Sequence, residues 1–184
     1  LSSKEEDFKE TDFRFDYIDY NNIFLTVDLT TNFGNILSYN TKLLEDLGYP
    51  EHYFSGSMIS ISKILPPGVG DGAVAVLQKF IREYSPADIT KNYFKLVFLS
   101  DCNRFLLPYQ THMKIEFSDD QVYGTAVLRK VKTKSNFILT KASGEIISHT
   151  QGVSSEFGLE QLSALFGTNI CLIIPELLNF YLPH

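Results

Sequence analysis

The alternation of apolar and polar residues predicts a strand-rich chain with a helical segment in its middle. Residues 23–29 are rich in β-branched and aromatic side chains, and turn-forming residues separate them from a second short strand at 36–39. These two strands are predicted to form a hairpin. Three more strands follow the helical segment, with turn-favouring residues at 101–103 and 118–120 between them. Their ranges are 93–99, 105–117 and 123–131.

The residues between the hairpin and the three later strands predict helices. Asn40 is a favourable N-cap for a helix over residues 41–47, with leucines on one face and Gly48 at its end. Apolar residues at i, i+3, i+6 and i+7 predict a longer helix over 71–84, and only short helical turns fit within 50–70. Antiparallel hairpins with one cluster of helices predict an α+β fold, in which the helices cover one face of the sheet.

The hairpin pattern occurs a second time later in the chain. Residues 34–38 (Gly-Asn-Ile-Leu-Ser) are echoed by residues 144–148 (Gly-Glu-Ile-Ile-Ser), and from there the offset between matching residues stays between 109 and 111. The second copy is expected to be cut off where its long helix and last three strands should begin. The chain is therefore predicted to hold an acidic lead-in (1–22), a complete domain (23–131), a connector too short for free movement (132–135) and the N-terminal part of a second domain (136–184).

These motifs resemble the signature of the PAS domain family. The hairpin at residues 34–40 (Gly-Asn-Ile-Leu-Ser-Tyr-Asn), the helix that ends in Leu-Gly-Tyr at 47–49, and Pro66 follow one another in the order of that signature. The resemblance covers residues 23–131, with the truncated second copy after them. It implies a five-stranded antiparallel sheet, with short helices and one long helix on its concave face. The tandem arrangement also resembles the PAS regions of large protist proteins of the tiny-macrocysts type.

Charge is concentrated at the N-terminus. The chain has a formal net charge of −6, and residues 1–20 alone hold seven acidic and three basic side chains. The remainder has no basic stripe, so we expect no nucleic-acid partner. The one basic run, at residues 129–134, is interpreted as a solvated strand edge or linker. The apolar positions of the lead-in, such as Phe13, Phe15 and Tyr17, fit either a strand or one face of a short helix.

Location follows from hydrophobicity and cysteine content. No apolar run approaches the roughly 20 residues that span a bilayer, so we expect no direct membrane contact from this segment. Cys102 and Cys171 form neither a disulfide framework nor a metal-ligand pattern. The prediction is a cytoplasmic location, or the cytosolic part of a larger, membrane-associated protein.

No catalytic, metal-binding or cofactor-binding residue is predicted. Haem-binding PAS domains commonly carry an axial histidine on or near the long helix, and residues 71–84 contain none. His52, His112 and His149 are therefore interpreted as surface or packing residues. The flavin-binding branch has a reactive cysteine in the short helical segment, where this chain has none, so Cys102 is interpreted as an incidental turn thiol.

The sequence contains no motif of a known catalytic type, so an enzyme is not predicted. The leading hypothesis is a PAS-type sensory or protein-interaction module in a larger signalling or scaffold protein, with a protein partner or self-association through the sheet and the N-terminal segment. One alternative is a sensor that binds a small apolar ligand between the long helix and the sheet, and another is a structural segment of a large assembly. The aromatic residues nearest that expected pocket are interpreted mainly as core: Phe80, Phe94, Phe98, Phe105 and Phe117.

Overall fold

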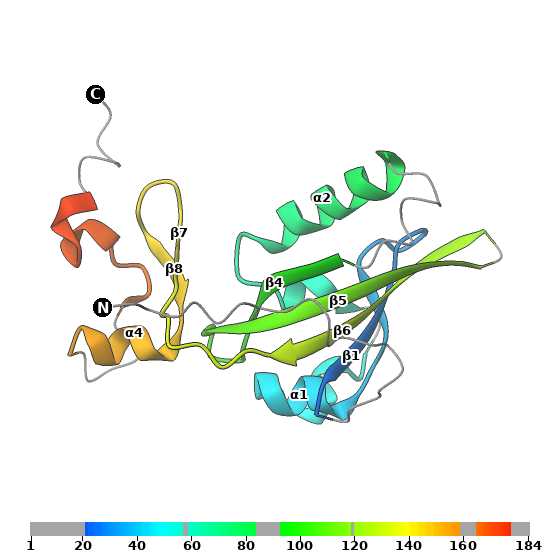
Figure 1. The fold of residues 1–184 in the computed structure, drawn as a ribbon, viewed down its shortest axis with the longest axis horizontal. Helices are drawn as coiled ribbons and strands as arrows, with labels where there is room; N and C mark the ends of the chain where they lie inside the picture. Colours follow the sequence, from blue (N-terminus) through cyan, green and yellow to red (C-terminus); the bar gives the residue numbers. More distant parts are fainter. Residues whose placement is uncertain (1–20, 57–58, 84–92, 119, 159–164, 178–184) are drawn as a thin grey trace, which may run out of the picture.

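The computed structural model describes residues 21–56, 59–83, 93–118, 120–158 and 165–177. Two separate hydrophobic clusters organise these residues, one around the long sheet and one around a short hairpin (Figure 1). We call the corresponding parts the first unit (21–131) and the second unit (136–177). The second unit lies beside one end of the long sheet of the first, at the left of Figure 1.

The first unit is built on an antiparallel sheet with the strand order β3-β2-β1-β6-β5-β4. The predicted antiparallel sheet is confirmed, with one difference in strand number. A two-residue strand at its edge, which no sequence pattern signals, makes six strands where five were expected. The strands are β1 (Ile23–Asp28), β2 (Asn35–Tyr39), β3 (Ile59–Ser60), β4 (Tyr93–Ser100), β5 (Leu106–Ser118) and β6 (Gln121–Lys130).

The first hairpin forms because its turn is held by a side chain. The carboxylate of Asp28 accepts the backbone N–H groups of Thr30 (2.7 Å) and Asn32 (2.9 Å). Gly34 then adopts φ +84°, which residues with a Cβ rarely reach, and leads the chain back into β2. Strand β1 also pairs along its whole length with β6, so β6 is a central strand and not an edge. The basic run that follows is therefore the end of a central strand plus the exposed connector.

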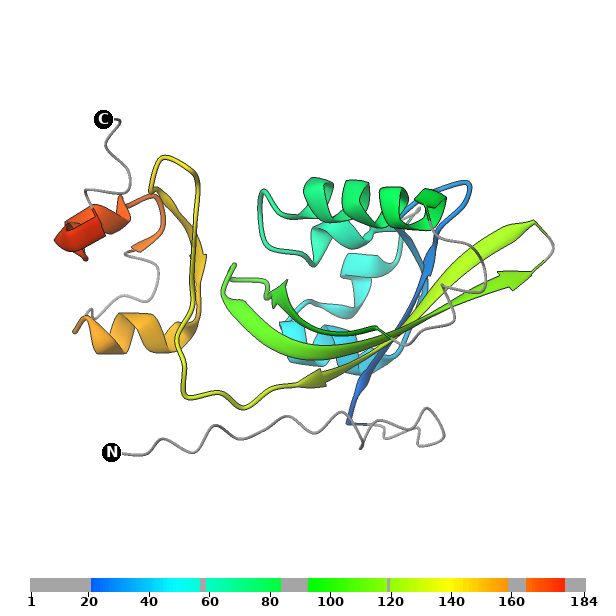
Figure 2. The same ribbon diagram turned by 45° about the horizontal axis from the view of Figure 1, so that its top comes forward.

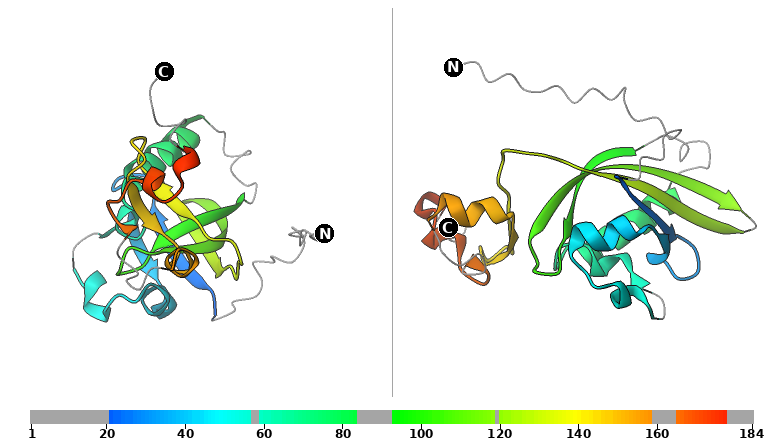
Figure 3. Two further views of the ribbon diagram at one scale, coloured as in Figure 1. Left: turned by 90° about the vertical axis from the view of Figure 1, so that its left-hand side faces the viewer. Right: turned by 90° about the horizontal axis from the view of Figure 1, so that it is seen from below.

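The helices of the first unit lie on the concave side of the curved sheet, as Figures 2 and 3 show. In chain order they are α1 (Thr41–Leu47), the 3₁₀ turns η2 (Glu51–Phe54) and η3 (Ile61–Lys63), and α2 (Gly70–Glu83). The leucines predicted for one face of α1 are buried and pack against inward side chains of β1 and β6, because that face is the only apolar one on the helix. The α+β class and the one-sided helical layer are thus confirmed.

The second unit consists of a short hairpin, a helix and two 3₁₀ turns. Strands β7 (Ile138–Thr140) and β8 (Ile146–His149) form an antiparallel hairpin, followed by α4 (Gln151–Glu156). Two 3₁₀ turns, η5 (Ile170–Leu172) and η6 (Pro175–Leu177), pack beside the hairpin in Figure 1. Its own small core contains Ile146, Val153, Leu165, Ile170 and Cys171.

None of the helices in the described ranges is long and apolar enough to cross a membrane.

Candidate functional site: the contact between the two units

The turn that joins β4 to β5 is a part of the first unit that touches the second. Asp101 shapes this turn, because its Oδ1 accepts the N–H groups of Asn103 (2.9 Å) and Phe105 (2.8 Å). Between them Arg104 takes the left-handed conformation, with φ 70°. This conformation turns the chain so that the Arg104 carbonyl and the Phe105 ring meet the second unit. We call residues 101–105 the junction turn.

The junction turn is anchored to the helical layer as well as to the sheet. Its Cys102 N–H donates to the carbonyl of Leu47 at the end of α1 (2.9 Å), and the N–H of Ser100, just before the turn, donates to Ile64 O (2.8 Å). The Tyr49 hydroxyl lies 3.4 Å from the carbonyl oxygen of Asp101. Burial, more than the neighbouring acidic groups, raises the pKa of Tyr49 to about 12, so this hydroxyl remains a hydrogen-bond donor at neutral pH. The end of α1 and the junction turn are therefore directly joined by hydrogen bonds.

The second unit presents one polar and several aromatic side chains to the junction turn. Ser148 Oγ donates a hydrogen bond to the Arg104 carbonyl. The ring of Phe105 packs against His149 (5.3 Å between centroids) and Phe166 (5.6 Å), and these two rings are themselves 4.9 Å apart. The contact is thus a three-ring cluster with a hydrogen bond at its side.

A second aromatic contact extends the junction along β4. Phe98, half-buried near the end of that strand, makes an edge-on contact with Phe137 just before β7, at 4.9 Å between ring centroids. The junction therefore extends from the junction turn onto β4, a geometry that resists rotation of one unit about a single contact.

His149 is a fully buried polar residue of the junction, with no exposed surface. Its Nδ1 lies 2.8 Å from the Thr150 carbonyl oxygen, which can only accept, so Nδ1 carries the proton. Among the described residues Nε2 has no hydrogen-bond partner. The imidazole ring thus serves as an aromatic surface between Phe105 and Phe166. The sequence prediction of a packing histidine is correct for this residue.

A pocket of about 450 Å³ lies beside the junction. One wall is the loop that leads into α2, and the other is the β7–β8 hairpin of the second unit. Its lining residues are Pro67, Gly68, Val69, Leu139, Thr140, Lys141, Ala142 and Ile147. The wall is mostly apolar, and Lys141 at its edge is already paired with Glu145 at 2.8 Å.

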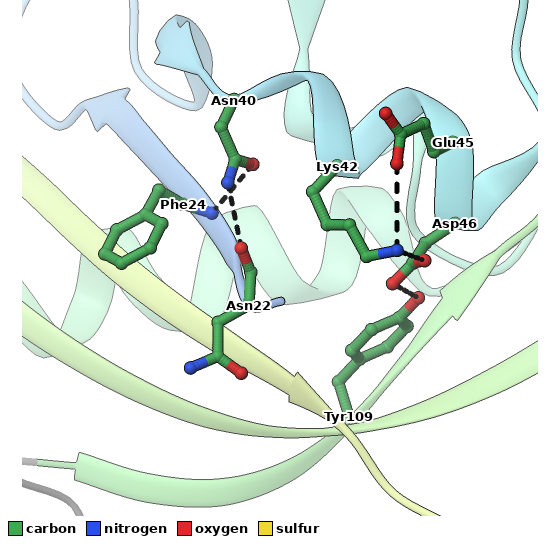
Figure 4. A network of polar contacts seen from close by, with 7 residues as sticks. All are labelled: Asn22, Phe24, Asn40, Lys42, Glu45, Asp46 and Tyr109. Carbon is green, nitrogen blue, oxygen red and sulfur yellow. Dashed lines mark hydrogen bonds and ion pairs between the residues drawn. The ribbon is translucent and has the colours of Figure 1, made fainter. Parts of the chain in front are cut away.

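Asn40 does not have the role that its position predicts. Its side chain makes no capping bond to α1; instead Oδ1 accepts the N–H of Phe24 (3.1 Å) and Nδ2 donates to the Asn22 carbonyl (2.8 Å), as Figure 4 shows. The prediction of a side-chain helix cap is wrong, because the start of β1 lies close enough to offer both a donor and an acceptor. Asn40 therefore fastens α1 to β1. Thr150 makes no side-chain cap either.

A second polar link in Figure 4 joins α1 to β5. Lys42 lies 2.8 Å from Asp46, whose other carboxylate oxygen is 3.4 Å from the hydroxyl of Tyr109. Hydrogen bonding to Asp46, and then its charge, raise the pKa of Lys42. Burial raises the pKa of Tyr109. Helix α1 is thus tied to the sheet at both ends.

The remaining residues that the sequence singled out are dispersed. His52 is exposed in η2, and His112 is buried in β5, where burial lowers its pKa. Cys102 is exposed in the junction turn. Phe117 was expected in the core but is 49% exposed, because β5 extends beyond the helical layer there. The side chains of Phe80 and Phe94, and the lead-in residues Phe13, Phe15 and Tyr17, lie outside what the structure describes.

Residues that sequence analysis missed make the junction: Ser148 and Arg104, which looked like ordinary strand and turn positions. The only sequence signal was the echo of Ser38 by Ser148. Within the described ranges, no His, Cys, Asp and Glu side chains gather in a group able to hold a metal ion.

The order of the strands and the helices inserted between β2 and β4 form the arrangement that the sequence resemblance implied. The first unit thus has a PAS-like α+β arrangement. Its sheet positions the junction turn at the end of its two longest adjacent strand pairings, β4–β5 and β5–β6.

Solved PAS and LOV domains are similar to this chain in fold. One is the PAS domain of a Desulfitobacterium hafniense protein, at 14% identity and TM-score 0.46, over 60% of this chain and 93% of that one. The PAS domain of an HTR-like protein from Haloarcula marismortui has 14% identity and TM-score 0.46, over 60% and 81%. A fungal LOV-domain photoreceptor has 12% identity and TM-score 0.48, over 65% and 80%. No family model and no curated protein matches the chain.

Proposed function

We propose that this chain is a non-catalytic PAS-type sensory or protein-interaction module of a larger signalling or scaffold protein, and that its signal passes through the junction turn. The observation that carries the proposal is the buried contact of Phe105 with His149 and Phe166. A turn that binds the helical layer on one side and a second unit on the other is suited to transmit a change of shape.

We also propose that residues 136–184 are the N-terminal part of a second PAS-like domain, with 132–135 as the connector. The local geometry of the second unit supports this division. Gly144 has φ +83° where Gly34 has +84°, and both hairpins shift register at the same place. The backbone bond from Ile61 to the Gly34 carbonyl (2.7 Å) likewise has its counterpart from Ile170 to Gly144 (2.8 Å).

The proposed mechanism is mechanical. A ligand, a partner or a modification that moves α1 would shift Leu47 and Tyr49, and with them the junction turn that they hold. The second unit would follow, because its Ser148 and His149 are fixed to Arg104 and Phe105. Such a relay needs no reaction chemistry, in agreement with the absence of predicted catalytic residues.

A small-molecule sensor is the second candidate, favoured by the pocket beside the junction. It lies between the two units, not between the long helix and the sheet as the sequence prediction had it. An apolar ligand there would touch Val69 of the first unit and Ile147 of the second, and would bias how they sit together.

Two measurements test the proposed function. Native mass spectrometry and an absorbance scan of the full chain distinguish interaction from sensing: bare protein with tyrosine absorbance alone supports interaction, and a bound chromophore or metabolite supports sensing. Replacing Phe13 and Phe15 by Asp should lower self-association or partner binding if the lead-in contributes to a docking face; unchanged sedimentation and pull-down would contradict that part.

The relay itself is tested by Phe105→Ala. Because the ring is buried in the junction, the variant should release the second unit and raise amide exchange in β8 at least tenfold. Phe117→Ala, at the exposed far end of β5, the strand that follows the junction turn, is the matched control and should leave β8 unchanged. Equal exchange in both variants would remove the basis of the proposal.

A further inference from the structure

The first unit has an exposed surface at the position that corresponds to the surface through which the second unit contacts the junction turn. This surface, which we call the opening face, consists of the exposed Leu37, Ser38 and Tyr39 on β2 and the half-buried Phe24 beside them on β1. Leu37 is 51% and Tyr39 36% exposed, which is unusual for large side chains of a strand that lies next to a core strand.

Strand register and hydrogen bonds establish which residues of the two units correspond. Thr26 pairs with Ser38, as Leu139 pairs with Ser148, and Leu25 pairs with Tyr39, as Ile138 pairs with His149. The N–H of Phe24 donates to the side chain of Asn40 at 3.1 Å, and the N–H of Phe137 to the side chain of Thr150 at 3.1 Å. The opening face is therefore matched, residue by residue, by Phe137, Ile147, Ser148 and His149.

The two matched surfaces differ in what covers them. Ser148 and His149 have no exposed surface, because the junction turn of the first unit is seated on them. Phe137 of the second unit contacts Phe98 of the first unit. In the first unit the corresponding Ser38 and Tyr39 are exposed. The corresponding surfaces are thus covered by the junction turn in the second unit and exposed in the first.

We propose that the opening face is the docking site for the junction turn of another PAS-type unit, one that precedes the first unit in the larger protein or belongs to a partner molecule. The partner is a β-hairpin turn with a left-handed residue followed by phenylalanine, as in residues 101–105. Its free carbonyl accepts the Ser38 hydroxyl and its phenylalanine packs on Tyr39. The inference rests on the proposed repeat relation between the two units.

The aromatic geometry of the opening face fits this occupant. The ring of Tyr39 lies 5.2 Å from that of Phe54, much as His149 lies 4.9 Å from Phe166 in the second unit. In the second unit the third ring of the cluster is Phe105 of the junction turn. In the first unit Phe54 is buried and already packs on Tyr49 (6.0 Å) and Tyr53 (5.1 Å), so the incoming phenylalanine packs on Tyr39, which is 36% exposed.

This contact is head-to-tail: a turn at one end of a unit meets a face at the other end of the next. Contacts of that kind extend into rows unless one side is blocked. In this chain the only junction turn described is already covered by the second unit, while Leu37, Ser38 and Tyr39 of the opening face are not buried by any part of the chain that the structure describes. We therefore expect the wild-type chain to accept a junction turn from another molecule but to donate none.

The experiment mixes a receptor with a donor. The receptor is the full wild-type chain, and the donor is the full chain with two substitutions. His149→Asp places a carboxylate in the aromatic cluster and so uncovers the junction turn. Tyr39→Ala prevents the donor from acting as a receptor. Sedimentation velocity should show a 1:1 complex with a dissociation constant on the order of 0.1 mM, as expected of a small interface. Adding Phe105→Ala to the donor, or Tyr39→Ala to the receptor, should weaken binding about tenfold or more.

A second probe removes the dependence on a folded donor. A hairpin peptide of residues 97–108, closed by a terminal disulfide and carrying Cys102→Ser, should shift the NMR signals of Leu37 and Tyr39 in the wild-type chain. Leu96→Ala, which alters a 52% exposed residue elsewhere on the sheet, should not change the affinity. Binding by neither probe, or binding that Tyr39→Ala leaves unchanged, would overturn the inference. Because β8 protection in the wild-type chain is measured separately, that result would leave the proposed function standing.

Discussion

Replacing Asn40 by aspartate separates two roles that the sequence makes equally plausible. Asparagine and aspartate are about equally good N-caps, so a capping residue tolerates the exchange with little loss. In the structure, however, the Asn40 amide donates to the Asn22 carbonyl over 2.8 Å and accepts from the Phe24 N–H over 3.1 Å. Aspartate retains the acceptor but loses the donor, and it places a carboxylate oxygen against a carbonyl oxygen.

The magnitude follows from these two bonds. Loss of the donated bond, with two oxygens left in contact, should lower the free energy of unfolding by about 1–3 kcal/mol in Asn40→Asp. Asn40→Ala loses both bonds, and at about 0.5–1.5 kcal/mol each the sum is similar. The two variants differ at one amide: the Phe24 N–H keeps an acceptor in Asn40→Asp and loses it in Asn40→Ala, so its hydrogen exchange should accelerate mainly in the alanine variant.

The assay is urea denaturation of the full chain followed by circular dichroism, with amide exchange of Phe24 measured by NMR. Asn103→Asp, at an exposed position of the junction turn, controls for the added negative charge. If Asn40→Asp unfolds within 0.5 kcal/mol of the wild type while Asn40→Ala loses about 1 kcal/mol, Asn40 is a helix cap and the reasoning from its bonds to β1 is wrong.

Three further variants test other parts of the fold. Gly70→Ala should destabilise by about 1–3 kcal/mol, since a Cβ there would lie 2.8 Å from Ser62 Cβ and 3.0 Å from its Cα, whereas Gly72→Ala, with open space around it, should stabilise α2 by up to about 1 kcal/mol in thermal unfolding. Burial lowers the pKa of His112, so the unfolded state binds more protons than the folded state below about pH 6.5. The free energy of unfolding should therefore decrease as the pH is lowered through this range, by at most about 1.4 kcal/mol per pH unit. His112→Gln should flatten that slope in denaturation at pH 5 to 8. Thr150→Val, which loses a 3.1 Å bond from Phe137 and a 2.9 Å bond to Asn136, should raise amide exchange in β7.

Most of the element boundaries of the first unit could be predicted from local pattern. The helix before Gly48 was predicted, with its end at Leu47 and its start at Asn40 or Thr41, because leucine spacing and the terminal Gly48 are both local signals. Strand β3 was missed, since a two-residue edge strand has no periodicity of its own and exists only because β2 offers it a partner. Alternation along the chain likewise does not distinguish a central strand from an edge, so the place of β6 was not predictable.

The residues of the candidate site were less predictable than the fold. The pattern marked Asn40 and the three histidines because these residue types are often functional, but gave no sign of Arg104 or Ser148. The carbonyl of Arg104, a residue in the left-handed conformation, accepts the hydroxyl of Ser148, 44 residues away. This contact depends on how the two sheets are brought together. Likewise, Phe98, Phe105 and Phe117 were all interpreted from the sequence mainly as core residues. In the structure Phe98 contacts the second unit edge-on, Phe105 lies in the aromatic cluster and Phe117 is exposed.

The sequence by itself determined the α+β class, the hairpins, the helical layer and the internal echo of residues 34–38 by 144–148, because these follow from local periodicity, turn chemistry and repetition. Only the tertiary structure decided that Asn40 binds β1, that the junction turn holds the second unit, and that matched surfaces are covered in one unit and open in the other. The physical reason is that a side chain's partner is set by what lies within a few ångströms of it, and those neighbours come from strands far apart along the chain.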